Sequence, residues 1–443
     1  MFFVTKTNLS EFREAVYQKV IWRPAAIIDL VDALTIAGHV NSPVALSEMP
    51  LFRRKFSSVY DALVQGELSE ELKSVFSDSQ EAEWETIAGY EIHAIDATPQ
   101  ERMAAETLAD RGVLKAQQKE AMRYGHKYSW LVRLVQRGTS WVAPEDMQRI
   151  STATTDTKVA AQQVKGLAVR AQRPKVITAD SRYRDKHFLG AFAGLENTYA
   201  LVRLQNNQKL SQAPEPKPQG SRGAPHKHGA DFQLSAIERD PDGSEAFYLG
   251  KQKVRVRVWH QLHFKRLTKV VGSVVCVEFL KEDGTPRYKR PLWLFWTGPE
   301  EVAPQDLCRM YLWRFAIEHM FRFLKQHMGL NSNRSSNLKS LQRWMWLVAL
   351  AYWQLLLLGK DVEDRSPAWY PAKRDSENKA RLTPGQVQRA AGRFIAKLGT
   401  PASSPRPAGK GRGRKKGYHP PPRKRYAVVY KSQRGKTSAS ATT

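Results

Sequence analysis

Two short apolar segments of the chain are each followed by an aspartate, and carboxylates in that setting are candidates for metal binding. Asp96 follows the segment 90–95, and Asp180 follows the segment 176–179. A carboxylate at the end of a buried strand costs free energy unless it is paired or bound to a metal ion. Each aspartate alone is more often a capping or turn residue, so the chemistry depends on whether the two segments become neighbouring strands.

A third carboxylate, Glu318, lies in a segment whose pattern predicts one long helix over residues 303–328. At 100° per residue, its side chain falls with three other polar side chains in a stripe about 60° wide. The residues of this stripe are Tyr311, Arg314, Glu318 and Lys325. A solvated amphipathic helix, with Arg314 and Glu318 as an ordinary ion pair four residues apart, explains the same stripe. Both interpretations stay open at this point.

If the three carboxylates converge, their chemistry is that of a site for hard cations. Carboxylate oxygens suit Mg²⁺ or Mn²⁺ rather than Zn²⁺. Two such ions about 3.5–4 Å apart clamp the attacking and leaving oxygens of an in-line displacement at phosphorus. Asp96, Asp180 and Glu318 are therefore candidate ligands of two metal ions that act on a phosphodiester.

The charge of the chain indicates a polyanionic partner. The 443 residues carry a formal net charge of +27, and nucleic acid is the commonest partner for such an excess. From residue 401 onward there are twelve Lys or Arg and no Asp or Glu, with prolines and glycines between them. This composition predicts a basic, largely disordered tail, of which residues 410–425 add salt-dependent affinity without sequence preference. A ribosome-like protein or a binder of lipid head groups is the alternative.

The cysteines and the apolar runs indicate where such a protein works. Cys276 and Cys308 lie far apart and lack metal-ligand spacing, which excludes a disulfide scaffold and fits a reducing cytoplasm. The N-terminus has no signal-peptide pattern. The most apolar run, residues 344–358, has about fifteen residues, whereas a membrane span needs roughly 20. We therefore expect a buried helix and no membrane segment.

The order of the expected elements indicates an α/β fold. Residues 1–85 look helical, and the basic residues 53–55 either contact DNA or cap the next domain. Expected strands follow over 90–96, 128–135 and 139–143, then a helix over 156–173, a strand over 176–180, a helix over 185–195 and a strand over 199–204. Antiparallel strands followed by alternating helix and strand predict a mixed sheet covered by helices.

The second half of the chain begins with a Pro- and Gly-rich loop over residues 206–230. Strands are expected over 254–259, 270–279 and 292–296, and an apolar helix over 338–358. The first of these strands alternates strictly, with Val on one face and with Arg255 and Arg257 on the other.

The spacing Tyr311-x₂-Arg314-x₃-Glu318-x₆-Lys325 resembles the Tyr-Arg-Glu-Lys signature of DDE transposases from a large group of bacterial insertion sequences. The resemblance covers roughly residues 85–360 and implies a ribonuclease H-like core. In this family the first Asp lies on the first strand, as Asp96 does here, and the second at the end of the fourth strand, as Asp180 does. The third carboxylate lies on a helix after a β-rich insertion, which Glu318 matches.

The resemblance also implies roles. Asp96, Asp180 and Glu318 would coordinate two Mg²⁺ ions, with Mn²⁺ as a substitute. Water would cut the transposon end, and the freed 3′-hydroxyl would attack target DNA. Tyr311 would hold terminal phosphates together with Arg314 and Lys325.

Other residues are weaker candidates for contact with DNA. Trp259 is the nearest match to a Trp that stacks on a flipped base in some relatives, but Trp293 and Trp296 compete with it, and a place in the core is the more frequent role for all three. Arg255 and Arg257 lie on the same ribbon. The remaining candidates, Arg182 and Arg184, follow Asp180 and either touch phosphate or are surface charges.

The resemblance further implies double-stranded DNA partners, namely terminal inverted repeats and target DNA, and a homodimer on paired ends in a bacterial cytoplasm, at the nucleoid. Expected domains are a helical N-terminal DNA-binding domain (1–85), a catalytic core in two parts (86–205 and 301–360), a linker and β-rich insertion (206–300), and the basic tail (361–443). Two alternatives remain: a metal-dependent nuclease or domesticated derivative without strand transfer, and a DNA-binding protein without enzymatic activity.

Overall fold

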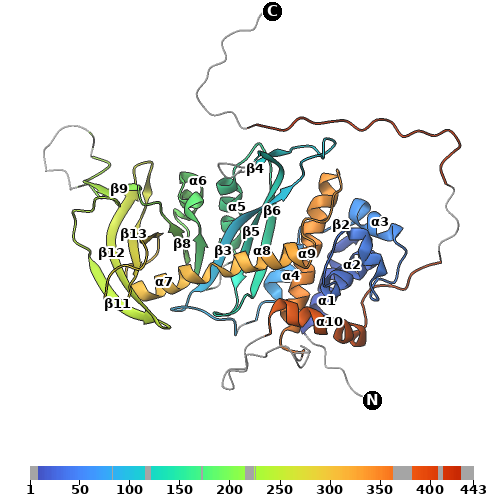
Figure 1. Ribbon diagram of the computed structural model, residues 1–443, viewed down its shortest axis with the longest axis horizontal. Helices are drawn as coiled ribbons and strands as arrows, with labels where there is room; N and C mark the ends of the chain where they lie inside the picture. Colours follow the sequence, from blue (N-terminus) through green and yellow to red (C-terminus); the bar gives the residue numbers. More distant parts are fainter. Residues whose placement is uncertain are drawn as a thin grey trace, which may run out of the picture.

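The structure is a computed structural model, which describes residues 8–81, 83–114, 121–170, 173–214, 224, 226–362, 382–407 and 413–430. Its centre is a mixed sheet (Figure 1). Five strands form the middle of this sheet in the order β6-β5-β3-β7-β8. They are β3 (Glu91–Glu101), β5 (Arg123–Leu134), β6 (Val142–Ile150), β7 (Lys175–Ala179) and β8 (Thr198–Arg203). The first three pair antiparallel, whereas β7 runs parallel to both β3 and β8. This mixed α/β arrangement confirms the expected ribonuclease H-like fold.

The sheet is buried on both faces because apolar side chains point alternately to either side along its strands. Ile95, Leu131 and Ile177 belong to a core shared with α5 (Asp156–Ala168) and α6 (Lys186–Leu189). Their neighbours, including Ala94, Val132 and Val176, face a second core. That core is shared with α7 (Pro304–Trp313), α8 (Ala316–Gln326) and α9 (Leu338–Leu358). The sheet is thus the middle of three layers.

The β-rich insertion extends the same sheet rather than forming a separate one. Its strands are β9 (Lys209–Gln212), β10 (Asp231–Gln233), β11 (Gly243–Leu249), β12 (Gln252–Phe264), β13 (Leu267–Phe279) and β14 (Leu292–Trp296). β14 pairs antiparallel with β8, which joins the insertion to the core. The three strands expected here are confirmed, and β9 lies within the expected loop 206–230. Residues 215–223 and 225 of that loop lie outside the described residues.

The expected helix over residues 303–328 is wrong in one respect, because two helices occupy this range. Between α7 and α8 the backbone stays right-handed but forms bonds three residues apart: Arg314 N donates to Tyr311 O at 3.1 Å, and Glu318 N donates to Phe315 O at 3.1 Å. Such bonds tighten the chain into a 3₁₀-like turn. The stripe of polar residues therefore crosses a turn in the helix, with Arg314 inside it.

Helices at the N-terminus pack against the central sheet and α9. They are α1 (Asn8–Gln18), α2 (Pro24–Ile36), the 3₁₀ helix η1 (Pro43–Glu48), α3 (Ser57–Gln65) and α4 (Leu72–Asp78), with a small sheet of β1 (Val20–Trp22) and β2 (Glu67–Leu68). Apolar side chains of these helices share a core with α9, as expected from the apolar run 344–358. Among the described helices, none is long and apolar enough to cross a membrane.

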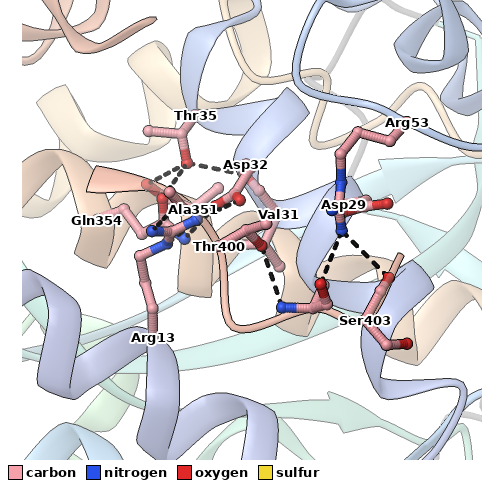
Figure 2. Close-up of polar contacts among 12 residues, drawn as sticks. Arg13, Asp29, Val31, Asp32, Thr35, Arg53, Ala351, Gln354, Thr400 and Ser403 are labelled. Atoms are coloured by element: carbon pink, nitrogen blue, oxygen red, sulfur yellow. Dashed lines mark hydrogen bonds and ion pairs between the residues drawn. The ribbon is translucent and has the colours of Figure 1, made fainter. Parts of the chain in front are cut away.

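A polar network fastens the N-terminal helices to α9 and to the chain after α10 (Figure 2). Arg13 on α1 binds the Asp32 carboxylate on α2, with Nε 3.2 Å from Oδ1, and Gln354 on α9 donates to the same oxygen at 3.0 Å. Arg53 and Arg54 both pair with Asp29 at 2.9 Å. Of the two interpretations of residues 53–55, packing against the rest of the protein fits Arg53 and Arg54, because their guanidinium groups bind Asp29.

The expected disordered tail is also wrong in part. Residues Pro384–Leu398 form a helix, α10, whose N-terminus has a capping box between Thr383 and Gln386. Val387, Ala391 and Ile395 bury the apolar face of α10 against the core. Its regular apolar spacing fell inside a stretch whose overall charge indicated disorder. Residues 363–381, 408–412 and 431–443 of the expected tail lie outside the described residues.

Candidate active site

Asp96 and Asp180 lie beside each other at one edge of the parallel part of the sheet. The β3–β7 register pairs Ile95 with Ala179, and each aspartate is the next residue on its own chain segment. β7 ends there, whereas β3 continues along β5 to Glu101. The sheet thus opens on one side of β3 at Asp96, and the expectation that Asp96 ends its strand is corrected accordingly. Ligands of α/β sheets commonly bind at such carboxyl ends.

The two carboxylates are held by their own backbone. Asp96 Oδ1 accepts a hydrogen bond from Ala97 N at 2.7 Å, and Asp180 Oδ1 accepts one from Arg182 N at 2.8 Å. Burial, and then the charge of Asp180, raises the pKa of Asp96 from 3.8 to about 6. The repulsion between the two carboxylates is therefore not fully neutralised by neighbouring cations. A divalent cation bound between them would remove this repulsion.

Glu318 reaches this pair through Arg314. Arg314 Nη2 donates to Glu318 Oε1 at 2.9 Å, while its Nη1 lies 3.8 Å from Asp96 Oδ2. The Arg314 side chain is only 13% exposed. Burial lowers the pKa of Arg314, but the neighbouring Tyr311, Asp96 and Glu318 raise it by more. The ion-pair interpretation of the stripe is thus confirmed, and the same pair lies beside Asp96, so the role of the stripe in a metal site stays a prediction.

No three His, Cys, Asp or Glu side chains in the described part of the chain are already arranged to hold a metal ion. The donor chemistry nevertheless fits a hard divalent cation, since Asp96 and Asp180 are adjacent and the pKa of Asp96 is raised. Glu318 is bound to Arg314, whose guanidinium also lies 3.8 Å from Asp96 Oδ2. The three-carboxylate ligand set therefore stays a prediction.

The other two residues of the signature also face the aspartates. Tyr311 is buried, and its ring lies 5.8 Å from the Arg314 guanidinium carbon. Lys325 is half-buried; burial lowers its pKa, and the charges of Asp96 and Glu101 oppose that effect. The stripe therefore presents three cationic or hydrogen-bonding groups around Asp96, which suits the binding of phosphate.

The basic residues after Asp180 support the same edge of the sheet. Arg182 Nη1 pairs with Asp156 Oδ2 at 2.8 Å, and its side chain remains 40% exposed. Arg184 donates to two glutamines and to a backbone carbonyl, with Nε 2.9 Å from Gln208 Oε1. Asp156, the first residue of α5, was not singled out from the sequence, although its position directly after the Thr155 N-cap is a usual place for an acid.

The residues of the insertion that the sequence suggested for contact with DNA make their contacts within the protein. Trp259 is 1% exposed, and its Nε1 donates to Arg239 O at 3.0 Å. Arg255 and Arg257 both pair with Glu278 on the neighbouring strand. The core interpretation of Trp259 therefore fits the structure, and its stacking on a base is not supported. Trp293 and Trp296 are buried as well.

A buried acid–base network beneath the site was missed by sequence reasoning. His93 Nε2 lies 2.9 Å from Glu145 Oε1, and Glu91 pairs with Lys175 and Arg133. His93 is thus a packed, hydrogen-bonded residue. Glu145 was missed because the expected strand stopped at residue 143, whereas β6 continues to Ile150. These groups join β3, β6 and β7, and so hold the strands that carry Asp96 and Asp180.

Comparison with protein families adds a finding that is independent of this geometry. Residues 143–354 match the family model described as Transposase DDE domain. The matched span begins on β6 and includes Asp180 and Glu318, whereas Asp96 precedes it, so its place in the site rests on the β3–β7 register. No curated protein matches the chain.

Proposed function

We propose that the chain, whose residues 143–354 match a transposase DDE domain, is a DNA transposase that cuts phosphodiester bonds at transposon ends and joins the freed 3′ ends to target DNA. One observation carries the proposal. Asp96 and Asp180 end the same parallel pairing on β3 and β7, and the Arg314–Glu318 pair on the neighbouring helices faces them. A pair of carboxylates surrounded by phosphate-binding groups suits transfer at phosphorus.

Transposases with this domain use divalent metal ions such as Mg²⁺. We propose that Asp96, Asp180 and Glu318 hold two Mg²⁺ ions, with Mn²⁺ as a substitute. Bound there, the ions would supply an activated water and stabilise charge on the attacking and leaving oxygens. Support comes from the hard oxygen donors and from the raised pKa of Asp96.

The residues of the chain then divide the remaining work. Asp96 and Asp180 are positioned by neighbouring strands and keep their carboxylates together. Arg314, once it releases Glu318, has a free fork of N–H donors for a non-bridging phosphate oxygen. Lys325 offers a compact charge beside Asp96, and the Tyr311 ring limits the directions open to Arg314. Strand transfer requires no further group, because the same site accepts either water or a 3′-hydroxyl as the nucleophile.

The proposal also includes the DNA partners, the oligomeric state and the role of the N-terminal residues. The terminal repeats and target DNA would be bound by a homodimer on paired ends, in a bacterial cytoplasm at the nucleoid. Residues 1–85 would contact the ends. Because Arg53 and Arg54 bind Asp29, that contact would depend on other exposed cations of these helices, such as Lys55.

Joining of a pre-cleaved end tests the proposal. Full-length protein is mixed with a duplex that carries the inverted repeat flanking its gene, a supercoiled target and Mg²⁺. We expect joined products, and we expect Asp96→Asn, Asp180→Asn and Glu318→Gln each to abolish them. Glu278→Gln, which changes an acid of the insertion, is the matched control. Cutting without joining supports a nuclease or a domesticated derivative. DNA binding with no divalent-dependent cleavage supports a protein without enzymatic activity.

A further inference from the structure

The outer edge of the central sheet is closed by a segment from the C-terminal part of the chain. β4 (Gly112–Leu114) pairs with β5 on one side. On its other side, Val429 forms a parallel bridge with Gly112, and Val429 N donates to Arg111 O at 2.8 Å. Tyr426 N donates to Glu106 O at 2.8 Å. Residues 425–430, here named the anchor strand, therefore add to the sheet edge by main-chain hydrogen bonds.

Side chains make this docking specific. Arg111 is 3% exposed, and its Nη2 donates to Tyr426 O at 3.2 Å while its Nη1 donates to Met103 O at 2.8 Å. The hydroxyls of Tyr430 and Tyr124 lie 3.1 Å apart, with their rings edge to face. A buried guanidinium is costly unless its N–H groups find acceptors, and the Tyr426 carbonyl of the anchor strand supplies one of them. The contact between Arg111 and the anchor strand is therefore specific.

The anchor strand is directly preceded by exposed positive charge. Residues 413–425, here named the basic arm, contain six cations and no acid: Arg414, Lys415, Lys416, Arg423, Lys424 and Arg425. Figure 1 shows this segment, in brown-red, running clear of the helices and strands before it reaches β4. Within the described chain, only Arg425 of the six makes an ion pair, with Glu106 at 3.2 Å. The other charges remain available to a polyanion.

The sheet gives the position of the anchor strand, and so of the anchored end of the basic arm, relative to Asp96. β5 pairs its Trp130 with Asp96 and its Tyr124 with Val113 of β4. Six residues along a strand span about 20 Å at about 3.4 Å each. B-form DNA rises about 3.4 Å per base pair, so this separation corresponds to about six base pairs.

We propose that the anchor strand fixes the basic arm against the backbone of a DNA duplex, with the anchored end of the arm about six base pairs from the phosphate held at Asp96 and Asp180. The position along the DNA rests on the proposed function, whereas the docking of the anchor strand does not. Because the anchor strand holds one end of the basic arm, the positive charge lies beside one stretch of duplex, and less conformational entropy is lost when the arm binds DNA.

Two full-length variants separate the anchor from the charge. Tyr426→Pro with Val429→Pro removes both main-chain donors and keeps every cation. Arg414→Gln with Lys415→Gln and Lys416→Gln removes three charges and keeps the anchor. Val428→Pro, which lies between the two donors, is the matched control. Thermal unfolding of each variant checks that the remaining fold is intact, and slow hydrogen exchange at Tyr426 and Val429 of the wild type is expected from their bonds.

The variants are compared by hydroxyl-radical footprinting, without metal, on the end duplex that the wild type cuts. We expect protection about six base pairs from the cleavage site, lost in the anchor variant and kept in the control. Unchanged protection in the anchor variant would overturn the proposal, as would fast exchange at Tyr426 and Val429 in the wild type. A duplex carrying the joined target shows whether the arm lies on the transposon end or on the target flank.

Binding to a 30-bp duplex of mixed sequence provides a second readout that needs no cleavage. Each phosphate contact lowers the slope of log affinity against log salt by about 0.9, so the charge variant should reduce the magnitude of that slope by about 2.7. An unchanged slope contradicts contact between the arm and DNA. If no duplex is ever cut but this slope changes, the proposed function fails and the contact of the arm with DNA stands. If a duplex is cut but the slope does not change, the proposed function stands and the contact of the arm with DNA fails.

Discussion

At the scale of single residues, the Asp96 carboxylate makes stability depend on pH. Its pKa is higher in the folded chain than the ordinary value of 3.8 and lies near 6. The folded state therefore binds the proton more tightly, and stability falls as pH rises from about 4 to about 6. Without metal, Asp96→Asn should be more stable than the wild type at pH 7.5 by about 2–3 kcal/mol.

Urea denaturation in EDTA, repeated between pH 4 and pH 8, checks this prediction. The gap between Asp96→Asn and the wild type should become small at pH 4, near the ordinary pKa of 3.8, where the carboxylate is protonated in the folded state and partly protonated in the unfolded state. A gap that does not change with pH would mean that the Asp96 charge has no cost in the fold. Asp306→Asn is a suitable control, because Asp306 pairs with Arg309 away from Asp180.

Arg314 gives a second prediction at this scale. Because its guanidinium binds Glu318 and lies beside Asp96, Arg314→Gln should tighten Mg²⁺ binding measured by calorimetry. The same change should slow cleavage by about 10²-fold, since it removes donors that stabilise charge in the transition state. Arg309→Gln on α7 serves as the control. Weaker Mg²⁺ binding in Arg314→Gln would show that Arg314 organises the metal ligands instead of competing with them.

Residue identities predicted part of this site and left part of it open. Strand-end aspartates indicated neighbouring positions, and the β3–β7 register agrees. The contact between Arg314 and Asp96 was not predictable, because it depends on how α7 and α8 lie over the sheet. Whether Trp259 is exposed or buried was also not predictable, because an alternating strand shows which residues share a face but not which face is covered.

At the scale of elements, burial of Trp259 leads to a prediction that separates a core role from base stacking. Trp259→Phe keeps most of the apolar volume but loses the hydrogen bond to Arg239 O. It should therefore lower the free energy of unfolding by about 1–3 kcal/mol and leave the cleavage rate unchanged at temperatures where the variant is folded. Thermal unfolding and single-turnover cleavage test the two parts. Loss of cleavage with unchanged stability would favour a role on DNA.

Elements with strong periodicity were predictable, and their interruptions were not. The helix 338–358 and the strands 270–279 and 292–296 match α9, β13 and β14 closely. The turn between α7 and α8 contains neither Gly nor Pro, so local propensity favours a continuous helix there. Tertiary packing decides instead: Phe321 of α8 packs edge to face on Trp130 of β5, with ring centroids 6.2 Å apart.

At the scale of the whole molecule, the sequence suggested a separate N-terminal domain and a disordered tail, whereas the structure joins both ends of the chain to α9. Arg13 donates to Gly399 O at 2.7 Å, and Arg53 donates to Ala402 O at 3.1 Å. Contacts across more than 300 positions leave no local signal, because each arginine looks like an ordinary surface charge and each acceptor is a backbone carbonyl. The α10 helix was hidden for a related reason, since its flanking composition indicated disorder.

The buried pair of Arg13 and Asp32 tests whether these parts unfold together. Both side chains are at most 4% exposed. Arg13→Met leaves a buried carboxylate without its cation and should cost about 3–5 kcal/mol, whereas adding Asp32→Leu should restore most of that stability. The exposed pair of Lys19 and Glu71 is the control, and Lys19→Met should cost at most about 1 kcal/mol.

Urea unfolding followed by both circular dichroism and tryptophan fluorescence gives the decisive comparison. Arg13 and Asp32 lie on α1 and α2, but Gln354 of α9 binds the same carboxylate, and α9 packs on β6 through the bond from Trp353 Nε1 to Pro144 O at 2.7 Å. Loss of the pair should therefore lower one shared transition, because strain at the N-terminal helices is transmitted to the sheet that carries Asp96. A separate early transition in Arg13→Met would instead mean that residues 1–85 unfold alone, as an independent domain would.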